Sequence, residues 1–545
     1  MKTIILTIGI FLPVLVNAQA PAWQWAAKAG FGANDRGTSV AFSKSTGESV
    51  ATGFYHSNGI TFGTVSLSNT LSNLTSDIFL VKYSSAGSVL WAKTFGTTGN
   101  DHGTGVCTDI AGNIYLTGYF DAASITFGSV TLTTIGEKDW FVVKFDPSGN
   151  VVWAANGGGT EDDYPQAIDV DATGNVFITG YYKSGSIQFG ANTLVNLNIN
   201  SYDIFLAKYN SSGSELWARA CGGTGEEESW SIAADVNGDV VVAGNFRSTV
   251  FTIDAITLNN PSPSGYEAIV YKYSSSGNFM WIRQYGSIYA ESFLDVDTDA
   301  SGNIVAAGYF EAATLTVGSV VLTNSTAFSF LDIFVVKLNA AGNVLWAKSA
   351  GGNDDEYAFC TGFDNSGNAY VSGYYESGLC TFSTNAITNY GGWDMFISKY
   401  DSSGNNVWAI SGGASGNDRA FGMDINNADE VITTGYFGSS SITFGPSVIT
   451  NSGNDDFFIA KLSSLTGIEN SVDNELLEVF QSGNEIYIAC NTVIDEIEIF
   501  NLSGQIIFKS TPATERVKLS LDDSGIYFLT ARSKDKFLRK KILLN

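Results

Sequence analysis

The feature that most constrains this chain is a hairpin of fixed length that recurs along it and is clearest at residues 139–153. Residues 140–145 are an apolar run, residues 146–150 (Asp-Pro-Ser-Gly-Asn) supply turn chemistry, and residues 151–153 begin a return strand. In every copy a carboxylate and a Trp lie 14 residues apart, with a Lys five residues after the carboxylate. Because this spacing does not vary, the turn admits no insertion without a shift of strand register. Complete copies run from Asp77 to Trp91, Asp139 to Trp153, Asp203 to Trp217, Glu267 to Trp281, Asp332 to Trp346 and Asp394 to Trp408.

Two incomplete copies stand at opposite ends of the repeated region. Residues 456–462 form a first half without the Trp, and residues 25–28 form a second half without the carboxylate. We expect residues 23–28 to pair beside residues 456–462 as the outermost strand of one shared unit. This exchange gives seven units and removes the open strand edge that would otherwise invite aggregation.

A longer repeat surrounds each hairpin. Ten residues after each Trp comes a carboxylate, followed by a strand with small side chains, a turn of the form Asp-x-x-Gly-Asn and an aromatic-ended strand. In the first strand of one repeat, Asp163, Pro165, Ala167 and Asp169 are predicted to share a face. A motif such as Ile-Thr-Phe-Gly at 125–128 predicts a small ribbon at the rim. The repeat Trp residues are Trp25, Trp91, Trp153, Trp217, Trp281, Trp346 and Trp408, and the carboxylates are Asp35, Asp101, Asp163, Glu227, Glu291, Glu356 and Asp418.

Four strands per repeat and no helix pattern predict an all-β fold, a seven-bladed β-propeller closed by N-terminal strand exchange and followed by a small β-sandwich. The Trp of each hairpin is expected to pack between blades. The recurring Trp-Ala-Lys, Gly-Gly, Asp-x-x-Gly-Asn and Asp-x-Phe-Val-Val-Lys patterns resemble the bacterial SBBP β-propeller repeat family over residues ~25–465. That resemblance implies an exported scaffold or binding domain without a common catalytic motif.

The ends of the chain indicate export. Residues 1–20 combine an early Lys, an apolar run and small-residue cleavage patterns, which predicts a secretory signal peptide. No later stretch reaches the roughly 18 apolar residues of a membrane-spanning helix, so no integral membrane segment is expected. Residues 21–467 are assigned to the propeller, and residues 468–545 to a separate module of alternating strands.

The C-terminal module resembles the sorting domain of the type IX secretion system. The resemblance rests on the order of three stretches, residues 497–505, 519–528 and 540–543. It implies that the type IX secretion machinery is a partner. It also implies that the protein is secreted or attached to the outer cell surface.

Charge and composition exclude several classes of function. The net charge of −26 argues against nucleic-acid binding, which needs clustered Lys and Arg. Five scattered cysteines without CxxC spacing make a disulfide framework unexpected. The two histidines, His56 and His102, fall in unrelated places of the repeat, which argues against His-rich metal sites and most His-dependent catalysis.

Three sets of side chains are candidate sites, each with a structural alternative. The seven carboxylates could form a cation-binding ring, or each could cap a Gly-rich turn or pair with a repeated Lys; the structural role is favoured because every repeat has it. Aromatic pairs such as Tyr181-Tyr182, Tyr374-Tyr375 and Tyr436-Phe437 could stack on sugars or pack between blades. Two oxygen-rich loops are calcium candidates or ordinary turns, and their residues are Asp169, Asp171, Asp295, Asp297 and Asp299.

No cofactor other than that calcium is expected, and no catalytic residue stands out. An enzyme should break the repeat symmetry in one or two blades, and the blade lengths vary little. We therefore favour a non-catalytic propeller that binds a polysaccharide or a surface protein. The alternative is an extracellular hydrolase or lyase that acts on glycans.

Overall fold

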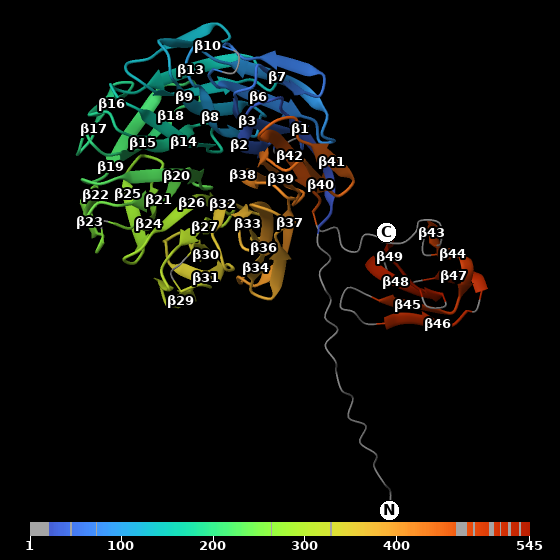
Figure 1. Ribbon diagram of the computed structural model, residues 1–545. Coiled ribbons are helices and arrows are strands. Elements are labelled where there is room, and N and C mark those ends of the chain that lie inside the picture. The colour runs from blue at the N-terminus through green and yellow to red at the C-terminus, as the bar shows by residue number, and fades with distance from the viewer. Residues whose placement is uncertain are drawn as a thin grey trace, which may run out of the picture. The chain divides into compact units, whose positions relative to one another are not determined.

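The computed structural model describes residues 21–464 except 44–45, 72–73, 263 and 328–329. In the C-terminal part it describes residues 477–482, 485–500, 506–512, 514–520, 525–533 and 536–544. The predicted signal peptide and residues 468–476 lie outside the described residues. The chain divides into two compact units, one of which is Ala22–Ser464. Every regular element in the described part is a β-strand, which confirms the all-β prediction (Figure 1).

Within its described residues, the unit Ala22–Ser464 contains seven antiparallel sheets of four strands, arranged around a common centre (Figure 1). Six of them follow the chain from the innermost to the outermost strand. These sheets are β2 (Asp35–Phe42), β3 (Ser49–Tyr55), β6 (Asp77–Tyr83) and β7 (Val89–Phe95); β8 (His102–Thr108), β9 (Ile114–Phe120), β12 (Asp139–Phe145) and β13 (Val151–Gly157); β14 (Asp163–Val170), β15 (Val176–Tyr182), β18 (Asp203–Tyr209) and β19 (Glu215–Cys221); β20 (Glu227–Ala234), β21 (Val240–Phe246), β24 (Glu267–Tyr273) and β25 (Phe279–Tyr285); β26 (Glu291–Thr298), β27 (Ile304–Phe310), β30 (Asp332–Leu338) and β31 (Val344–Ala350); and β32 (Glu356–Phe363), β33 (Ala369–Tyr375), β36 (Asp394–Tyr400) and β37 (Asn406–Gly412).

The remaining sheet joins the two ends of the unit. Its strands are β38 (Asp418–Ile425), β39 (Val431–Phe437), β42 (Asp456–Leu462) and β1 (Trp23–Ala29). Strand β1 runs antiparallel to β42 with Ala26 opposite Ala460 and Lys28 opposite Phe458. The predicted pairing of the two incomplete hairpin halves is therefore present.

A two-stranded ribbon accompanies each sheet and lies in the chain between its second and third strands, as the Ile-Thr-Phe-Gly motif predicts. Its turn needs a left-handed residue, and Gly128 supplies it in one ribbon with φ of 59°. The ribbons are β4 (Gly59–Phe62) with β5 (Val65–Ser68), β10 (Ser124–Phe127) with β11 (Val130–Thr133), β16 (Ser186–Phe189) with β17 (Asn192–Val195), β22 (Val250–Ile253) with β23 (Ile256–Asn259), β28 (Thr314–Val317) with β29 (Val320–Thr323), β34 (Leu379–Phe382) with β35 (Asn385–Thr388), and β40 (Ser441–Phe444) with β41 (Ser447–Thr450).

The core lies between neighbouring sheets. In the first six sheets and in β42, the third strands are buried or nearly so on both faces, because each sheet packs against one neighbour on either side. One cluster joins Ile78 and Leu80 of β6 to Phe141 and Val143 of β12, its neighbour in the next sheet. Apolar burial between sheets is thus the main stabilising term of the unit.

Every innermost strand carries a β-bulge near its middle. In β14 the register shifts between Pro165 and Ala167, and the other six innermost strands shift at the equivalent place. The bulge breaks the alternation of side chains. The prediction that Asp163, Pro165, Ala167 and Asp169 share one face is therefore wrong: Asp163 is buried between sheets, whereas Ala167 and Asp169 line the central cavity.

Six of the seven repeated Trp residues join their sheet to the next one through a glycine, and Trp408, whose indole N–H has no partner among the described residues, is the exception. The Trp153 ring lies against Gly213 in the outer turn of the next sheet, and its indole N–H donates to the Ser211 carbonyl at 3.1 Å. Lys144, on the strand beside Trp153, donates to the same carbonyl. Gly213 has φ of 83°, and a Cβ there would lie 2.6 Å from the ring. The same Trp–Gly contact is present at Trp25–Gly87, Trp91–Gly149, Trp217–Gly277, Trp281–Gly342 and Trp346–Gly404.

The C-terminal strands form two sheets. One orders β43 (Leu477–Ser482), β44 (Glu485–Ile494) and β47 (Thr514–Ser520), and the other orders β46 (Ile506–Ser510), β45 (Glu496–Phe500), β48 (Gly525–Ser533) and β49 (Lys536–Leu544). Ile497, Ile499 and Leu529 are fully buried. The strands predicted in this region are thus present. Over the described residues, the structure has no helix of the length and apolarity needed to cross a membrane.

The Trp–Gly contact can be tested with two glycines. We expect Gly213→Ala to lower the free energy of unfolding by at least about 1–2 kcal/mol, because alanine is strained at positive φ and its methyl group would displace Trp153. Gly378→Ala is the matched control, since no heavy atom lies within 4 Å of a Cβ there. Denaturant unfolding of both variants measures the difference, and equal stability would contradict the proposed contact.

Candidate functional site

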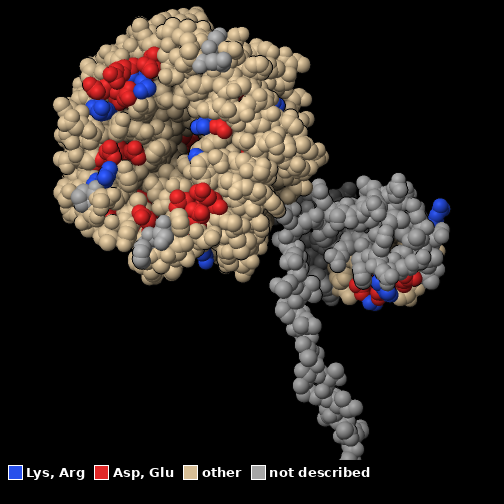
Figure 2. Space-filling model, viewed as in Figure 1, with Lys and Arg blue, Asp and Glu red and all other residues tan. Residues whose placement is uncertain are grey.

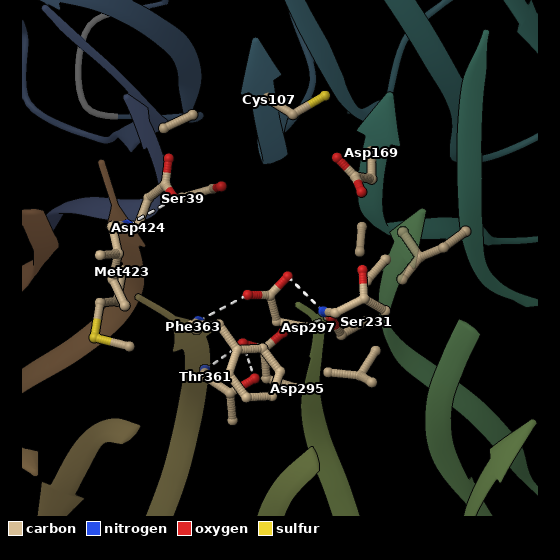
Figure 3. A pocket seen from close by; sticks show the side chains of 18 of the residues that line it. Ser39, Cys107, Asp169, Ser231, Asp295, Asp297, Thr361, Phe363, Met423 and Asp424 are labelled. Atoms are coloured by element: carbon tan, nitrogen blue, oxygen red, sulfur yellow. Dashed lines mark hydrogen bonds between the residues drawn. The ribbon is translucent and has the colours of Figure 1, made fainter. Parts of the chain in front are cut away.

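The innermost strands of all seven sheets line a central cavity of about 900 Å³. Its wall alternates small, apolar and acidic side chains, and Figure 3 shows Asp169, Asp297 and Asp424 pointing into it from three different strands. At one end the cavity wall includes Arg36, Phe359 and other residues near the strand starts, and at the opposite end it includes turn residues. The cavity is large enough for a small ligand or for one part of a larger one.

Asp169, Asp297 and Asp424, three of the six aspartates that line the cavity, connect neighbouring sheets. Asp169 accepts a hydrogen bond from the backbone N–H of Ala234 at 2.8 Å, and Asp297 accepts one from Phe363 at 3.0 Å. Asp424 of β38 accepts one from Phe42 of β2 at 2.7 Å. Innermost strands are sheet edges whose N–H groups need acceptors. Each of these aspartates therefore supplies an acceptor to the strand edge of the next sheet.

Asp295 has the same role one layer nearer the start of the strand. It accepts hydrogen bonds from the hydroxyl of Ser231 and from the backbone N–H of Thr361, which belong to the two flanking sheets. Burial raises the pKa of Asp295 to about 6, against the lowering effect of those donors. Ser39 occupies the position equivalent to Asp295 in its own strand, and its hydroxyl oxygen accepts a hydrogen bond from the backbone N–H of Val106.

The structure separates the five calcium candidates into two groups. Asp169, Asp295 and Asp297 are the strand residues described above, whereas Asp171 and Asp299 close the second turn of their sheets. Asp171 accepts from the N–H groups of Thr173 and Asn175, and its other oxygen lies 3.5 Å from the Lys208 ammonium. Among the described residues, no group of three or more His, Cys, Asp or Glu side chains is placed to hold a metal ion. Calcium binding stays a prediction.

The carboxylates that follow the repeated Trp residues cap loops. Asp163 accepts from the Gly159 N–H at 2.7 Å and from the Ser184 hydroxyl at 2.9 Å, and it is fully buried. The capping bond to a residue four positions earlier recurs in all seven sheets. The loop-capping interpretation, rather than a solvent-facing cation ring, describes these contacts.

The repeated lysines pair with a different set of acids. Lys272 lies 2.6 Å from Asp235 and Lys461 lies 2.7 Å from Glu430, in both cases a residue of the second turn. Four other sheets have the equivalent pair. These are Lys82–Glu48, Lys208–Asp171, Lys337–Asp299 and Lys399–Asp364. The lysines and the capping carboxylates thus belong to separate networks.

The greatest chemical variation among the sheets lies directly after the capping carboxylate. We call these seven positions the mouth residues; each lies at the beginning of an innermost strand. Arg36 pairs with Asp455, the His102 imidazole contacts the Ser76 hydroxyl at 2.8 Å, and other positions carry different chemistry. The mouth residues are Arg36, His102, Tyr164, Glu228, Ser292, Tyr357 and Arg419. They define one face of the unit, which we call the mouth face.

Aromatic side chains dominate the mouth face. Tyr119 and Tyr164 have ring centroids 5.2 Å apart, and Tyr357 lies 5.2 Å from Tyr309. Charged side chains in the view of Figure 2 form a few groups around the central hollow and are separated by uncharged surface. This face therefore offers stacking surfaces with a small number of charges.

The aromatic pairs predicted from the sequence divide between the core and the mouth face. Tyr182, Tyr375 and Phe437 are fully buried in the core. Tyr181 is half-buried at the mouth, in ring contact with Trp230 at 6.0 Å. One residue of each pair is thus structural, and the other belongs to the mouth layer.

The two histidines occupy different positions of the repeat, but they lie close together in space. The His56 and His102 rings are 6.5 Å apart, and His102 stacks on Phe54 at 3.8 Å. The ring nitrogens of His102 contact Ser76 and Tyr119, each at 2.8 Å. Desolvation lowers the pKa of His102 to about 3, so the imidazole is neutral at ordinary pH. Packing of adjacent sheets brings the two histidines together although they occupy different positions of the repeat.

The fold and the lined cavity define the class of this protein as a β-propeller. Residues 482–545 match the family described as "Secretion system C-terminal sorting domain". The type IX sorting domain predicted at the C-terminus is thus present. A chain that carries it is secreted or attached to the outer cell surface.

Relatives of the chain include two curated proteins and propellers of known structure. It is 23% identical over 469 residues to an uncharacterized WD repeat-containing protein of Acanthamoeba polyphaga mimivirus, covering 71% of this chain and 33% of the relative. It is 24% identical over 316 residues to the regulatory protein FlaEY of Caulobacter vibrioides, covering 54% and 32%. The chain spans about a third of the length of these relatives. The WD40 β-propeller domain of Doa1 is similar with 8% identity and a TM-score of 0.42, covering 81% of this chain and 96% of that one.

The capping carboxylates predict an unusual dependence of stability on pH. Burial raises the pKa of Asp163 to about 7 and that of Glu356 to about 8, so the folded state holds protons that the unfolded state releases. This contribution is fully present below the unfolded pKa near 4 and is lost as pH rises through 6–8. Asp171 and Asp364, whose pKa is lowered, act in the opposite sense and lose their contribution below about pH 4. We expect the melting temperature to be highest near pH 5 and to fall toward pH 8.5.

The variant Glu356→Gln should flatten that fall, because one titrating group is removed. Each proton of difference changes the free energy of unfolding by about 1.4 kcal/mol per pH unit. Glu376→Gln, at an exposed position of the same sheet, is the control. A melting temperature that rises steadily from pH 5 to 8.5 would contradict the prediction.

Proposed function

We propose that this chain is an exported, seven-bladed β-propeller, closed by its N-terminal strand, that binds an extracellular polysaccharide or surface protein at its mouth face without catalysis. The chain would comprise a signal peptide at residues 1–20, the propeller at 21–467 and the sorting domain at 468–545. The repeats resemble the SBBP type. Export would use the type IX machinery through the C-terminal domain.

Closure is supported by contacts identical to those between the other sheets. Trp25 of β1 and Lys461 of β42 both donate to the Ser85 carbonyl in the outer turn of the sheet that begins with β2. Trp217 and Lys208 do the same at Ser275. The sheet assembled from both ends of the chain therefore contacts its neighbour as a continuous one does.

One observation supports binding at the mouth face above all others. Positions that build the repeat hardly vary, whereas the mouth residues include Arg, His, Tyr, Glu and Ser at one structurally equivalent place. In a repeat protein, positions shared by all units hold neighbouring units together, and variation at a partly exposed position can supply a specific surface. Six of the mouth residues are half-buried, and Ser292 is buried. Arg36 lines the cavity, as do residues further along all seven innermost strands, so a ligand could contact several sheets at once.

The same contacts favour binding over hydrolysis. Asp169, Asp297 and Asp424 already serve as acceptors for backbone N–H groups. His102 is held neutral between two hydroxyl groups. Groups used in this way are poorly suited to move protons during a reaction.

A cysteine pair can test the closure. Ala26 and Ala460 are direct cross-strand partners, within the usual separation of a disulfide. We expect Ala26→Cys with Ala460→Cys to form that bond in the exported protein and to raise the melting temperature by a few degrees. Peptide mapping should find the cross-link. Ala26→Cys combined with Ala155→Cys, which lies on another sheet, should give none, and an unlinked first pair would refute the closure.

Binding can be tested with the purified mature chain on a panel of bacterial, plant and algal polysaccharides and envelope proteins. We expect a hit to protect backbone amides at the starts of the innermost strands from hydrogen exchange. The turns at the opposite end, such as residues 171–175, should be unaffected. Protection confined to those turns would contradict the proposed site. Product analysis on every hit separates binding from turnover, and turnover abolished by changing one carboxylate would favour the hydrolase.

A further inference from the structure

One mouth residue, Arg419, has a guanidinium group without a polar partner among the described residues. Its carbon Cζ lies 3.5 Å from the centre of the Trp393 ring and 4.3 Å from that of Tyr374. The Nε atom is buried and has no hydrogen-bond acceptor. Nη1 and Nη2 have no acceptor either, and they are not buried. The side chain is thus held flat on aromatic rings, with the ends of its fork open.

The equivalent arginine in the next sheet shows what this position normally requires. Arg36 stacks on Tyr436 at 4.3 Å, as Arg419 stacks on Tyr374, but Arg36 also donates from Nε and Nη2 to the Asp455 carboxylate. Asp455 immediately precedes the third strand of its sheet. The residue at that place in the preceding sheet is Trp393. At this backbone position Arg36 finds the carboxylate of Asp455, whereas Arg419 finds only the indole face of Trp393.

A buried or half-buried cation without a counter-charge is costly to maintain. Cation–π contacts recover part of that cost, and a hydrogen-bonded anion recovers more. Arginine presents a planar fork that matches a carboxylate in a bidentate manner. Arg419 is therefore organised to accept a carboxylate from outside the chain, in the role that Asp455 fills for Arg36.

Aromatic side chains lead from Arg419 to the cavity. Tyr374 stacks with Phe359 at 5.4 Å, and Phe359 lies 5.0 Å from Phe421. Phe359 and Phe421 are half-buried and line the cavity. Tyr374 itself is buried, so a ligand anchored at Arg419 would extend over the partly exposed Phe359 and Phe421 toward the centre of the mouth.

We propose that Arg419 and this aromatic track bind an acidic polysaccharide, with the arginine holding the carboxylate of a uronic acid unit. The inference rests on the proposed binding function and specifies its ligand class. Sugar rings present flat C–H faces that pack against aromatic rings, and a uronate carries its carboxylate on the same ring.

A peptide ligand is less well matched to this surface. Extended peptides usually bind by adding a strand to a free sheet edge. The innermost edges are already occupied at several points, because Asp424, Asp297 and Ser39 accept the N–H groups that such a peptide would need. Stacking and one charged contact remain as the available means of recognition, and these fit a glycan.

The test compares short oligogalacturonates with the same oligomers as methyl esters, using calorimetry on the mature chain. We expect the acid form to bind at least about tenfold more tightly, because it adds a charge-assisted bidentate contact that the ester lacks. Arg419→Gln should abolish that preference and leave the weak binding of the ester unchanged. Arg419→Lys should restore only part of it, because an ammonium group keeps the charge but loses the fork. Far-UV circular dichroism and melting curves verify that both variants fold.

Arg247→Gln is the matched control. Arg247 lies on the same face but already pairs with Glu226 at 3.2 Å, so this variant should keep the preference for the acid form. Equal affinity of acid and ester, or a preference that survives in Arg419→Gln, would overturn the inference. So would binding of poly-glutamate that depends on Arg419 while oligogalacturonate does not bind. If a neutral ligand protects the mouth face and binds Arg419→Gln with the same affinity as the unaltered chain, the proposed function stands and this inference fails.

Discussion

The contact that fixes the geometry of the repeat is the one between an indole and a glycine of the next sheet, which recurs at six of the seven sheet interfaces. Trp153 shows its parts: a ring against Gly213 and an N–H bonded to the Ser211 carbonyl, which Lys144 also reaches. The hairpin length is fixed because it sets where the next turn meets the previous indole. A longer turn would move the glycine and the carbonyl together, and both halves of the contact would be lost.

The inner edges of the sheets pose a second problem, which carboxylates solve. Seven strand edges converge on one cavity, and their N–H groups cannot pair with another strand. Asp424 reaches from β38 to Phe42 of β2, as Asp169 and Asp297 do between other sheets. Acidic side chains around the cavity are therefore compatible with a stable fold, because each one accepts hydrogen bonds that the backbone would otherwise lack.

The sequence was sufficient for the elements that recur without variation. The hairpins, the rim ribbons and the pairing of β1 with β42 all follow from spacing, since equal spacing requires equal geometry. It was not sufficient for side-chain direction on the innermost strands. Asp169 and Asp171 read as one oxygen-rich loop, yet a bulge near Ala167 turns the first toward the cavity while the second closes a turn. A bulge has no signature in a strand of small residues.

The mouth residues were missed for a related reason. A search for motifs finds positions that carry the same residue type in every copy. It overlooks Arg36, His102 and Arg419 because their position carries different residue types in different copies. Alignment of the seven copies against one another carries the signal: the position after an invariant acid changes from arginine to histidine, tyrosine, glutamate and serine.

The separation between recurring contact residues and variable mouth residues also explains how binding specificity can arise in a regular repeat protein. Neighbouring sheets meet at the mouth through one variable residue of each, so a change at a single position alters a pair and leaves the Trp–Gly contacts intact. With Asp455 as partner, Arg36 is neutralised; with Trp393 as partner, Arg419 keeps its charge at the surface. The fold tolerates either outcome because its stability resides in the inter-sheet core. A binding surface can therefore change one side chain at a time without a change in the architecture that presents it.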